Sequence, residues 1–210
     1  RRSSDLDEVS RHAAVRLFIQ RARAAMPQFA LDERSASAAA SVCRRLDGMP
    51  LAIEIAAARA AALGVEGLAS LLDARFLTLT GGRRTVLPRH QTLRATLDWS
   101  YGLLSEAERR VLRRLSVFAG GFTLEAASKV TGDDTIPEAD AVEVVIDCVG
   151  KSLISADVGA GIPRYRLLET TRTYARERLD ESGEQAATVR RHAEFYRSEE
   201  RRVGKECSSG

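Results

Sequence analysis

The chain has 210 residues, of which 44% are hydrophobic, so it has enough apolar material to bury one large core or two small ones. Its 32 basic and 29 acidic residues leave a formal net charge of +3, which is weak evidence for a nucleic-acid partner. The three cysteines, Cys43, Cys148 and Cys207, have no Cys-x-x-Cys spacing, which favours reduced thiols over a disulfide framework or a zinc site. No apolar run approaches the ~20 residues of a membrane span, and the N-terminus lacks the apolar core of a signal peptide, so we expect a cytoplasmic protein with no membrane partner.

The first part of the chain predicts amphipathic helices. Between residues 12 and 26 the apolar side chains recur at i, i+3, i+4, i+7 and i+11, which makes one stripe of a helix. A second helix is expected over about residues 34–46, with Asp32 or Ser35 available as its N-cap.

A Gly-Met-Pro sequence separates this second helix from a third. Gly48 is expected to end the second helix, and Pro50 suits the first turn of the next one, where its missing N–H would have no helical partner. The run that follows, LAIEIAAARAAAL, is too uniformly small to show a stripe, so we expect it to pack closely on several sides. A short helix over residues 65–74 and a connecting loop, TLTGGRRTVLPRHQ, complete this half.

The second half of the chain predicts a winged helix. A helix from Thr92 is expected to stop near Ser105, and Ser105 with Glu108 forms the Ser-x-x-Glu capping pattern of the next helix, which Gly120 and Gly121 end. Two further short helices, over residues 124–130 and 138–149, flank an acidic loop. The segments SLISAD and RYRLLE alternate with period two around a glycine-containing loop, as in a small hairpin, and lead to a closing helix over residues 170–182.

The motifs of a self-contained enzyme are missing from the sequence. The only Gly-Lys pair, Gly204 with Lys205, lacks the preceding glycine and the following hydroxyl of a P-loop, so the chain is not expected to hydrolyse ATP alone. The three histidines lie in unrelated segments without a His-Glu-x-x-His pair, and no Gly-x-Ser-x-Gly nucleophile elbow occurs. We therefore expect no catalytic residue and no metal site.

Several long motifs resemble one known family. They are VCRRLDGMPLAIEIAAARAAAL, LLDARFLTLTGGRRTVLPRHQTLRATLDWSYGLLSEAERRVLRRLSVFAGGFTLEAA and YRLLETTRTYARERL, and they follow the family's order over about residues 10–196. The sequence resembles the second half of the NB-ARC module, as found in bacterial STAND-type predicted ATPases fused to transcriptional regulators of the LuxR and SARP types. The resemblance implies a mainly α fold, in which an ARC-like helical bundle is followed by a winged helix with a small β-hairpin.

The resemblance also divides the chain into segments. Residues 1–9, where the sequence begins abruptly as a fragment would, correspond to the residual end of an upstream nucleotide-binding subdomain, and residues 10–80 to the helical ARC-like subdomain. Residues 81–91 are expected to be a linker and residues 92–182 the winged helix. Residues 183–210 should start a further helical region, with a last helix to about residue 197. The polar sequel, SEERRVGKECSSG, lacks an apolar stripe, so we expect a frayed, disordered or foreign tail.

Gly48, Met49, Pro50 and Leu51 match the Gly-Leu-Pro-Leu-Ala motif of that family, with Met49 in place of its usual leucine. The resemblance implies that this corner packs over the adenine of bound ADP or ATP, whose phosphates, with Mg, lie on the P-loop of the upstream subdomain. A proline ring is a stiff apolar plate, and the helix N-terminus beside it offers spare N–H donors. The alternative is a corner that merely joins two helices. Because the phosphate contacts belong to the absent subdomain, this fragment alone is not expected to bind nucleotide tightly.

A second implied site lies at the start of the closing helix. The family's winged helix carries a Met-His-Asp sensor, whose histidine approaches the β-phosphate, and Leu167, Leu168 and Glu169 occupy the matching positions here. Leu168 cannot donate a hydrogen bond, which argues against a direct phosphate contact. Glu169 could hold the wing against a neighbouring helix, or it could be only a favourable acid at a helix N-terminus.

Two main functions fit this reading. The first is a regulatory fragment of an ATP/ADP-dependent STAND-type signalling ATPase, a slow switch that controls transcription. Its partners would be the upstream P-loop subdomain and downstream helical repeats, and bound ADP would hold the subdomains together until exchange releases them. The alternative is a winged-helix DNA-binding transcriptional regulator. A third possibility is a helical scaffold with no ligand of its own.

The third helix of the winged helix distinguishes these functions. Its sequence, EADAVEVVIDCVG, carries four carboxylates and no basic residue before Lys151, whereas a recognition helix normally presents basic or amide side chains to DNA. We therefore expect the winged helix to serve protein contacts and direct DNA binding to be unfavourable. The basic residues lie on the first of its helices, where we expect an exposed face packed on neighbouring subdomains, or else a weak nonspecific DNA contact: Arg109, Arg110, Arg113 and Arg114.

Overall fold

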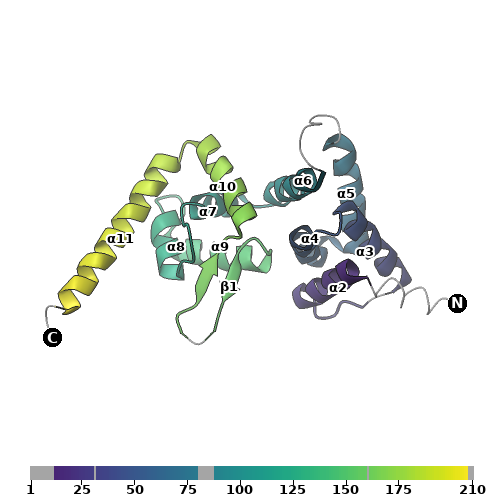
Figure 1. Cartoon of the computed structure of the whole chain (residues 1–210), viewed down its shortest axis with the longest axis horizontal. Helices are drawn as coiled ribbons and strands as arrows, with labels where there is room; N and C mark the ends of the chain where they lie inside the picture. Colours follow the sequence, from purple (N-terminus) through teal and green to yellow (C-terminus); the bar gives the residue numbers. More distant parts are fainter. Residues whose placement is uncertain (1–11, 31, 80–87, 160, 208–210) are drawn as a thin grey trace. The chain divides into compact units, whose positions relative to one another are not determined.

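The protein is mainly helical, with one small antiparallel β-hairpin (Figure 1). A computed structural model describes residues 12–30, 32–79, 88–159 and 161–207. The chain forms two compact units, residues 1–103 and 104–210. The predicted fold class, a helical bundle followed by a winged helix, is confirmed. Within the described ranges, no helix is long and apolar enough to cross a membrane.

The first unit is a bundle of helices around α4. Its described helices are α2 (Ala13–Ala25), α3 (Glu33–Arg45), α4 (Pro50–Leu63), α5 (Val65–Leu79) and α6 (Pro88–Gly102). Helix α4 contacts α2, α5 and α6. Small side chains allow neighbours to approach one helix closely from several directions, so α4 needs no single apolar stripe. Its buried apolar residues confirm this predicted packing: Ala52, Ile53, Ile55, Ala56, Ala57 and Ala60.

Helix α3 begins at a capping box that uses both of the predicted caps. The Ser35 N–H donates to Asp32 Oδ1 at 2.8 Å, and the Asp32 N–H donates to Ser35 Oγ at 2.9 Å.

The loop after α5 is shorter than predicted. Helix α5 continues beyond residue 74, and α6 begins at Pro88, a residue type favoured at the first helical position. The rest of that predicted loop, residues 80–87, lies outside the described residues, as does the predicted upstream segment 1–9.

Helix α6 belongs to the first unit, although the sequence suggested a winged helix from residue 92. Its Trp99 is 2% exposed and packs in the hydrophobic core of the first unit. Its Ser100 accepts two hydrogen bonds from Arg59 of α4, at the carbonyl (3.2 Å) and at Oγ (3.1 Å). The boundary between the compact units falls after Leu103, which agrees with these contacts of α6 inside the first unit.

The second unit has the order of elements predicted for a winged helix. Its described elements are α7 (Glu106–Leu115), α8 (Leu124–Thr131), α9 (Glu138–Gly150), β1 (Ser155–Asp157), β2 (Arg164–Arg166), α10 (Glu169–Ser182) and α11 (Gln185–Cys207). The predicted capping box of α7 is present, since Ser105 Oγ accepts from the Glu108 N–H and the Glu108 carboxylate accepts from the Ser105 N–H. Glu108 also forms an ion pair with Lys151 at the end of α9. One buried carboxylate thus links the start of α7 to the end of α9.

The hairpin is attached to the core through its second strand. Strand β1 pairs with β2 in antiparallel register, with Ala156 opposite Tyr165. Tyr165 also exchanges two backbone hydrogen bonds of 2.8 Å with Phe122, which precedes α8. The two rings stack with their centroids 6.4 Å apart, and both residues are buried. The wing therefore has a fixed base on the helical core.

The C-terminal segment is helical for longer than the sequence suggested. Helix α11 runs to Cys207, whereas we expected a frayed or disordered tail after residue 197. Glu and Arg, which dominate residues 199–202, have high helix propensity, so the segment continues the helix without an apolar stripe of its own. The last residues, 208–210, lie outside the described part.

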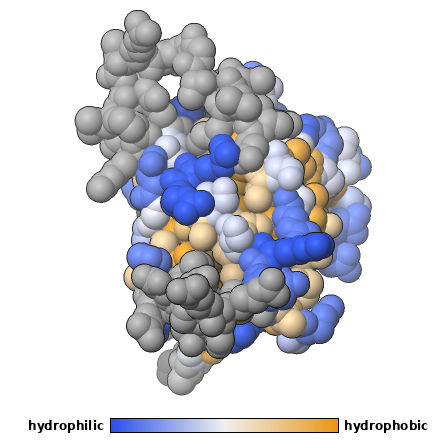
Figure 2. Space-filling model, turned by 90° about the vertical axis from the view of Figure 1, so that its right-hand side faces the viewer, coloured by the Kyte–Doolittle hydropathy of each residue, from blue (hydrophilic) through white to orange (hydrophobic). Residues whose placement is uncertain are grey.

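The surface mixes polar and apolar residues. On the face shown in Figure 2, hydrophobic residues lie between hydrophilic ones, as is normal for small helical units. Among the described residues, the large hydrophobic side chains with the greatest exposure are at the tip of the wing, where Val158 is 71% and Ile162 77% exposed.

We predict that Gly132→Ala destabilises the second unit. Gly132 ends α8, and a Cβ built on it would lie 2.7 Å from the Ser128 carbonyl oxygen, closer than real contacts allow. Overpacking of this kind lowers the free energy of unfolding by about 1–3 kcal/mol. The matched control is Gly120→Ala, because a Cβ at Gly120 would meet nothing within 4 Å. Urea denaturation of both variants tests this, and equal stabilities would contradict it.

Candidate functional site

The predicted nucleotide-binding residues form one sharp corner between α3 and α4. Asp47 and Gly48 both have left-handed backbone conformations, with φ of 50° and 65°. The Gly48 N–H donates to the Cys43 carbonyl at 3.0 Å, which closes the last turn of α3. Met49 then has an extended backbone, and Pro50 is the first residue of α4. The predicted corner between two helices is confirmed.

The side chains of the corner differ in exposure. Pro50 is exposed, whereas Met49 and Leu51 are half-buried, and Met49 packs against the core of the first unit. The first N–H groups of α4 have no acceptor within the helix, as at any helix start. The corner thus presents an apolar ring next to spare donors, a geometry that can receive a flat group with acceptor atoms on its edge.

The second predicted site lies on the other unit. Leu167 is buried, and Leu168 is the half-buried N-cap of α10, without a side-chain capping bond. Glu169 has a side chain that is 73% exposed, and it pairs with Arg172 of the same helix at 2.7 Å. The hydrogen bonds from Arg172 lower the pKa of the Glu169 carboxyl. In this geometry Glu169 stabilises the first turn of α10 and does not hold the wing against a neighbouring helix.

Helix α9 has an acidic outer face, as its sequence indicated. The inner face packs through Ala141, Val145 and Cys148, all buried. The exposed residues include Glu138, Asp140, Glu143 and Asp147, with Ile146 among them at 53% exposure. Glu138 pairs with Lys129 of α8 at 2.8 Å. The other three carboxylates face solvent on the helix that occupies the recognition position of a winged helix.

The wing has a different electrostatic character from α9. Arg164 and Arg166 on β2 are exposed, and Arg164 donates to the Gly121 carbonyl at 3.2 Å. These two arginines lie beside the exposed apolar tip of the hairpin. The wing therefore directs two basic side chains to solvent.

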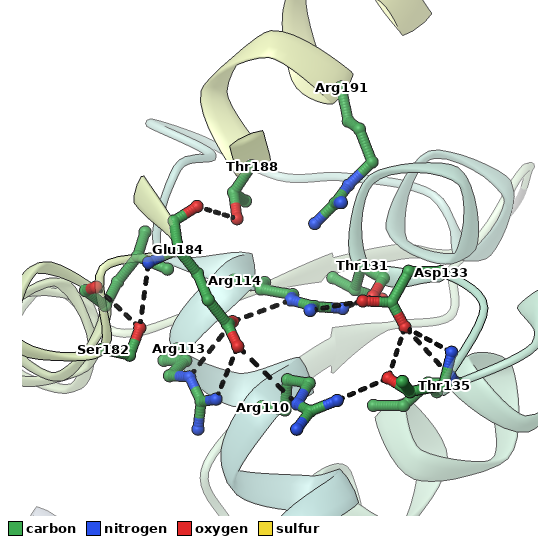
Figure 3. A network of polar contacts seen from close by, with 12 residues as sticks. Arg110, Arg113, Arg114, Thr131, Asp133, Thr135, Ser182, Glu184, Thr188 and Arg191 are labelled. Atoms are coloured by element: carbon green, nitrogen blue, oxygen red, sulfur yellow. Dashed lines mark hydrogen bonds and ion pairs between the residues drawn. The ribbon is translucent and has the colours of Figure 1, made fainter. Parts of the chain in front are cut away.

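Two of the four arginines of α7 are buried and the other two are half-buried, which corrects our expectation of an exposed basic face. Arg113 is 8% and Arg114 4% exposed. Both point to one carboxylate, Glu184, at the turn between α10 and α11 (Figure 3). Arg113 Nη2 lies 2.8 Å from Glu184 Oε1, and Arg114 Nε lies 3.0 Å from Glu184 Oε2. Arg110 adds a more distant ion pair at 3.7 Å.

Arg114 also ties the network to the end of α8. Its Nη1 donates to the Thr131 carbonyl and its Nη2 to Asp133 Oδ2, both at 2.6 Å. Arg191 of α11 donates from Nε to the Val130 carbonyl at 2.9 Å. One network therefore joins α7, the loop after α8 and the start of α11. Sequence analysis missed it because Glu184 stands about 70 residues from the arginines, and only an acid directly after the helix-ending Gly183 signalled its place.

The charges of this network are mutually stabilised. Burial alone would raise the pKa of the Glu184 carboxyl, but hydrogen bonds from Arg113 and Arg114 outweigh it and lower that pKa. Burial also opposes the ionised form of Asp133, yet bonds from Thr135 and Arg114 lower its pKa strongly. These arginines are consequently committed to internal partners, and Arg113 and Arg114 are not available to phosphates of DNA.

Thiol and metal chemistry find little support in the described residues. Cys43 and Cys148 are buried at 4% and 0% residue exposure. Burial raises the pKa of Cys43 to about 11, so its thiol stays protonated near neutral pH. No group of three His, Cys, Asp or Glu residues in the described ranges is arranged to hold a metal ion.

Comparison with known proteins gives the same architecture for the second unit. Residues 104–180 match the family model of the winged helix-turn-helix domain. The second unit contains such a domain. The match begins where the second compact unit begins, and it ends before Glu184 and α11, which the network nevertheless fixes to the same unit.

Three relatives are similar over most of the chain. A protein named "Putative HTH-type transcriptional regulator" from Mycobacterium tuberculosis is 45% identical over 183 residues, 87% of this chain and 21% of that protein. An uncharacterized protein of the same species is 43% identical over 181 residues, 85% of this chain and 46% of that protein. The regulatory protein AfsR of Streptomyces coelicolor is 30% identical over 203 residues, 91% of this chain and 19% of that protein. The chain thus spans only part of the length of each.

We predict that Glu184→Gln destabilises the second unit by about 2–4 kcal/mol, because it removes the anion that two buried guanidinium groups share and leaves Arg114 with Asp133 and Arg113 with the more exposed Glu106. The matched control is Glu194→Gln in α11, which removes a carboxylate whose partner Arg190 is exposed, with an ion pair of 3.7 Å. That control should change the free energy of unfolding by less than about 1 kcal/mol. Urea denaturation measures both, and similar small losses would contradict the prediction.

The pH dependence of stability gives an independent test of the same carboxylate. Because the folded state lowers the pKa of Glu184, this group stabilises the fold above the ordinary glutamate pKa of about 4.3, and the stabilisation is lost as the pH falls below it. Between about pH 5 and pH 3, the free energy of unfolding should therefore fall more for the unsubstituted chain than for Glu184→Gln. Parallel pH profiles of the two proteins in denaturant titrations would contradict this.

Proposed function

We propose that this chain is a segment of a transcription regulator. The main support is that residues 104–180 match a winged helix-turn-helix domain. The chain is also 45% identical to a protein named as an HTH-type transcriptional regulator. AfsR, named as a regulatory protein, supports the same role at 30% identity. Because the chain spans 21% and 19% of those two proteins, this role is that of one part within a longer regulator, for which a cytoplasmic location is proposed.

The winged helix of this segment is proposed to make protein contacts rather than to read bases. Three exposed carboxylates of α9, Asp140, Glu143 and Asp147, would meet the phosphate backbone if α9 entered a major groove. The arginines of α7 do not compensate, because Arg113 and Arg114 are buried against Glu184. Electrostatic repulsion therefore favours a protein partner for α9.

Direct DNA binding is the second candidate, and the match to a winged helix-turn-helix domain favours it. The observation on its side is the wing, where Arg164 and Arg166 are exposed on β2. In this version the wing contacts the phosphate backbone, and α9 contributes little.

A nucleotide switch is the finer mechanism that we propose for the longer protein. The exposed Pro50, between half-buried Met49 and Leu51, supports a corner that covers the adenine of ADP or ATP. The phosphates and Mg would be held by a P-loop subdomain upstream in the same parent chain, and helical repeats downstream would be a further partner. The parent would then be a slow ATPase whose arrangement depends on the bound nucleotide. Leu168 and Glu169 have no role in phosphate binding in this proposal.

For DNA binding, we predict that the 210-residue chain gives no sequence-selective complex tighter than ~1 μM at about 0.15 M salt. The test is an electrophoretic shift assay with random duplex and with promoter fragments. The double variant Glu143→Lys, Asp147→Lys should gain affinity for random duplex, because it replaces repulsion by attraction. Tight, sequence-selective DNA binding by the unsubstituted 210-residue chain, lost in Arg164→Ala or Arg166→Ala, would instead establish direct DNA binding.

For nucleotide binding, we predict that the isolated chain shows no micromolar affinity for ATP in calorimetry, because charge-assisted phosphate contacts belong to the upstream subdomain.

In the longer protein, Pro50→Gly should reduce the ADP retained on purification, since it removes the apolar ring and loosens the corner. Leu63→Ala is a suitable control, because Leu63 is 38% exposed at the far end of α4. Equal ADP content in all three proteins would return the corner to a purely structural role.

A further inference from the structure

The corner between α3 and α4 is tied to α6 by a side-chain contact. Thr92 Oγ1 donates to Asp47 Oδ2 at 2.6 Å, across 45 positions of sequence. Thr92 is 7% exposed and lies near the start of α6, whereas Asp47 directly precedes Gly48 at the end of α3. Hydrogen bonds to a charged acceptor are among the stronger ones, and this one is partly shielded from water.

Asp47 meets two requirements that conflict for most residues. Its φ of 50° is left-handed, a conformation that glycine adopts freely and that costs free energy for other residues, least for Asn and Asp. Glycine would relieve that strain but has no carboxylate for Thr92. The residue at this position therefore satisfies both the turn and the contact, which points to a positioning role for its side chain.

A second polar contact fixes the other end of α6. Arg59, in the third turn of α4, donates to the carbonyl and the hydroxyl of Ser100, near the end of α6. Because Asp47 precedes α4 and Thr92 is near the start of α6, the two helices run in the same direction with one polar contact toward each end. Helix α6 is thus held along α4 at two points, with Trp99 in the core between them.

We infer that the Asp47–Thr92 contact makes the Gly48–Leu51 corner and helix α6 move as one body. A displacement of the corner is then passed to α6, which ends at Gly102, immediately before the second unit begins in the sequence. This coupling depends only on the contact and the packing described above. Its use to report a bound nucleotide rests on the proposed function.

Hydrogen exchange of the 210-residue chain, followed residue by residue by NMR, tests the coupling. In Thr92→Val, which keeps the shape and removes the hydroxyl, the corner amides of Gly48 and Met49 should exchange about tenfold faster. In the unsubstituted chain, the Gly48 N–H donates to the Cys43 carbonyl and the Met49 N–H to the Leu46 carbonyl. Thr92→Ser should restore slow exchange, because it keeps the donor. Unchanged exchange in Thr92→Val, or no rescue by Thr92→Ser, would overturn the inference.

Variants at Asp47 separate contact from strain. Asp47→Gly relieves the left-handed strain and also removes the contact with Thr92. If Asp47 serves only the local turn, the amides of Gly48 and Met49 should exchange more slowly in this variant. If the contact holds the corner, these amides should exchange faster. We expect faster exchange. Asp47→Asn keeps an acceptor and tolerates the conformation, so it should stay close to the parent. Amides of the buried α2 residues Phe18 and Ile19 serve as the control, and equal acceleration there would show general destabilisation and overturn the coupling.

ADP retention in the longer protein separates the coupling from the nucleotide proposal. If Pro50→Gly and Thr92→Val both reduce retained ADP, the coupling acts on the nucleotide site. If Pro50→Gly reduces it and Thr92→Val does not, the link between coupling and nucleotide is overturned. If neither does, the proposed nucleotide function fails, while the exchange result still decides the coupling in this chain.

Discussion

The second unit depends on the pairing of buried arginines of α7 with Glu184. Guanidinium groups at 8% and 4% residue exposure would be costly without an anion, and Glu184 is the carboxylate that both of them share. Since Glu184 immediately precedes α11, the pairing fixes where that helix leaves the domain. Arg114 extends the same network to Thr131 and Asp133, so the first helix, the loop after the second and the last helix share one set of charges.

This internal use of the arginines changes how the winged helix can act. A basic sequence on α7 suggests a surface for polyanions, but the guanidinium groups of Arg113 and Arg114 face inward, and the exposed side of α9 is acidic. The wing, in contrast, exposes Arg164 and Arg166. The family match identifies the type of domain, whereas the charge distribution bears on what the domain binds. A helix-turn-helix fold therefore does not by itself make DNA the partner.

The first unit uses polar contacts in a similar way, between segments distant in sequence. Helix α4 packs through small apolar side chains, which allow close approach but give little directional preference. Directional contacts from Asp47 to Thr92 and from Arg59 to Ser100 then set the position of α6 along α4. Apolar burial supplies the stability of such a bundle, and a few buried hydrogen bonds select one arrangement of its helices.

The sequence by itself determined the local features of this protein. Helix starts at Asp32 and Ser105, the corner at Gly48 and Pro50, the hairpin and the acidic face of α9 all follow from residues close together in the chain. Only the tertiary structure decided that α6 packs with the first unit, that the α7 arginines are buried, and that Thr92 holds the corner. These depend on partners 41 to 71 positions away, and side-chain pattern within one helix does not identify a distant partner. A periodic pattern shows which face of a helix is apolar, whereas the contact that completes a buried charge is known only once the chain has folded.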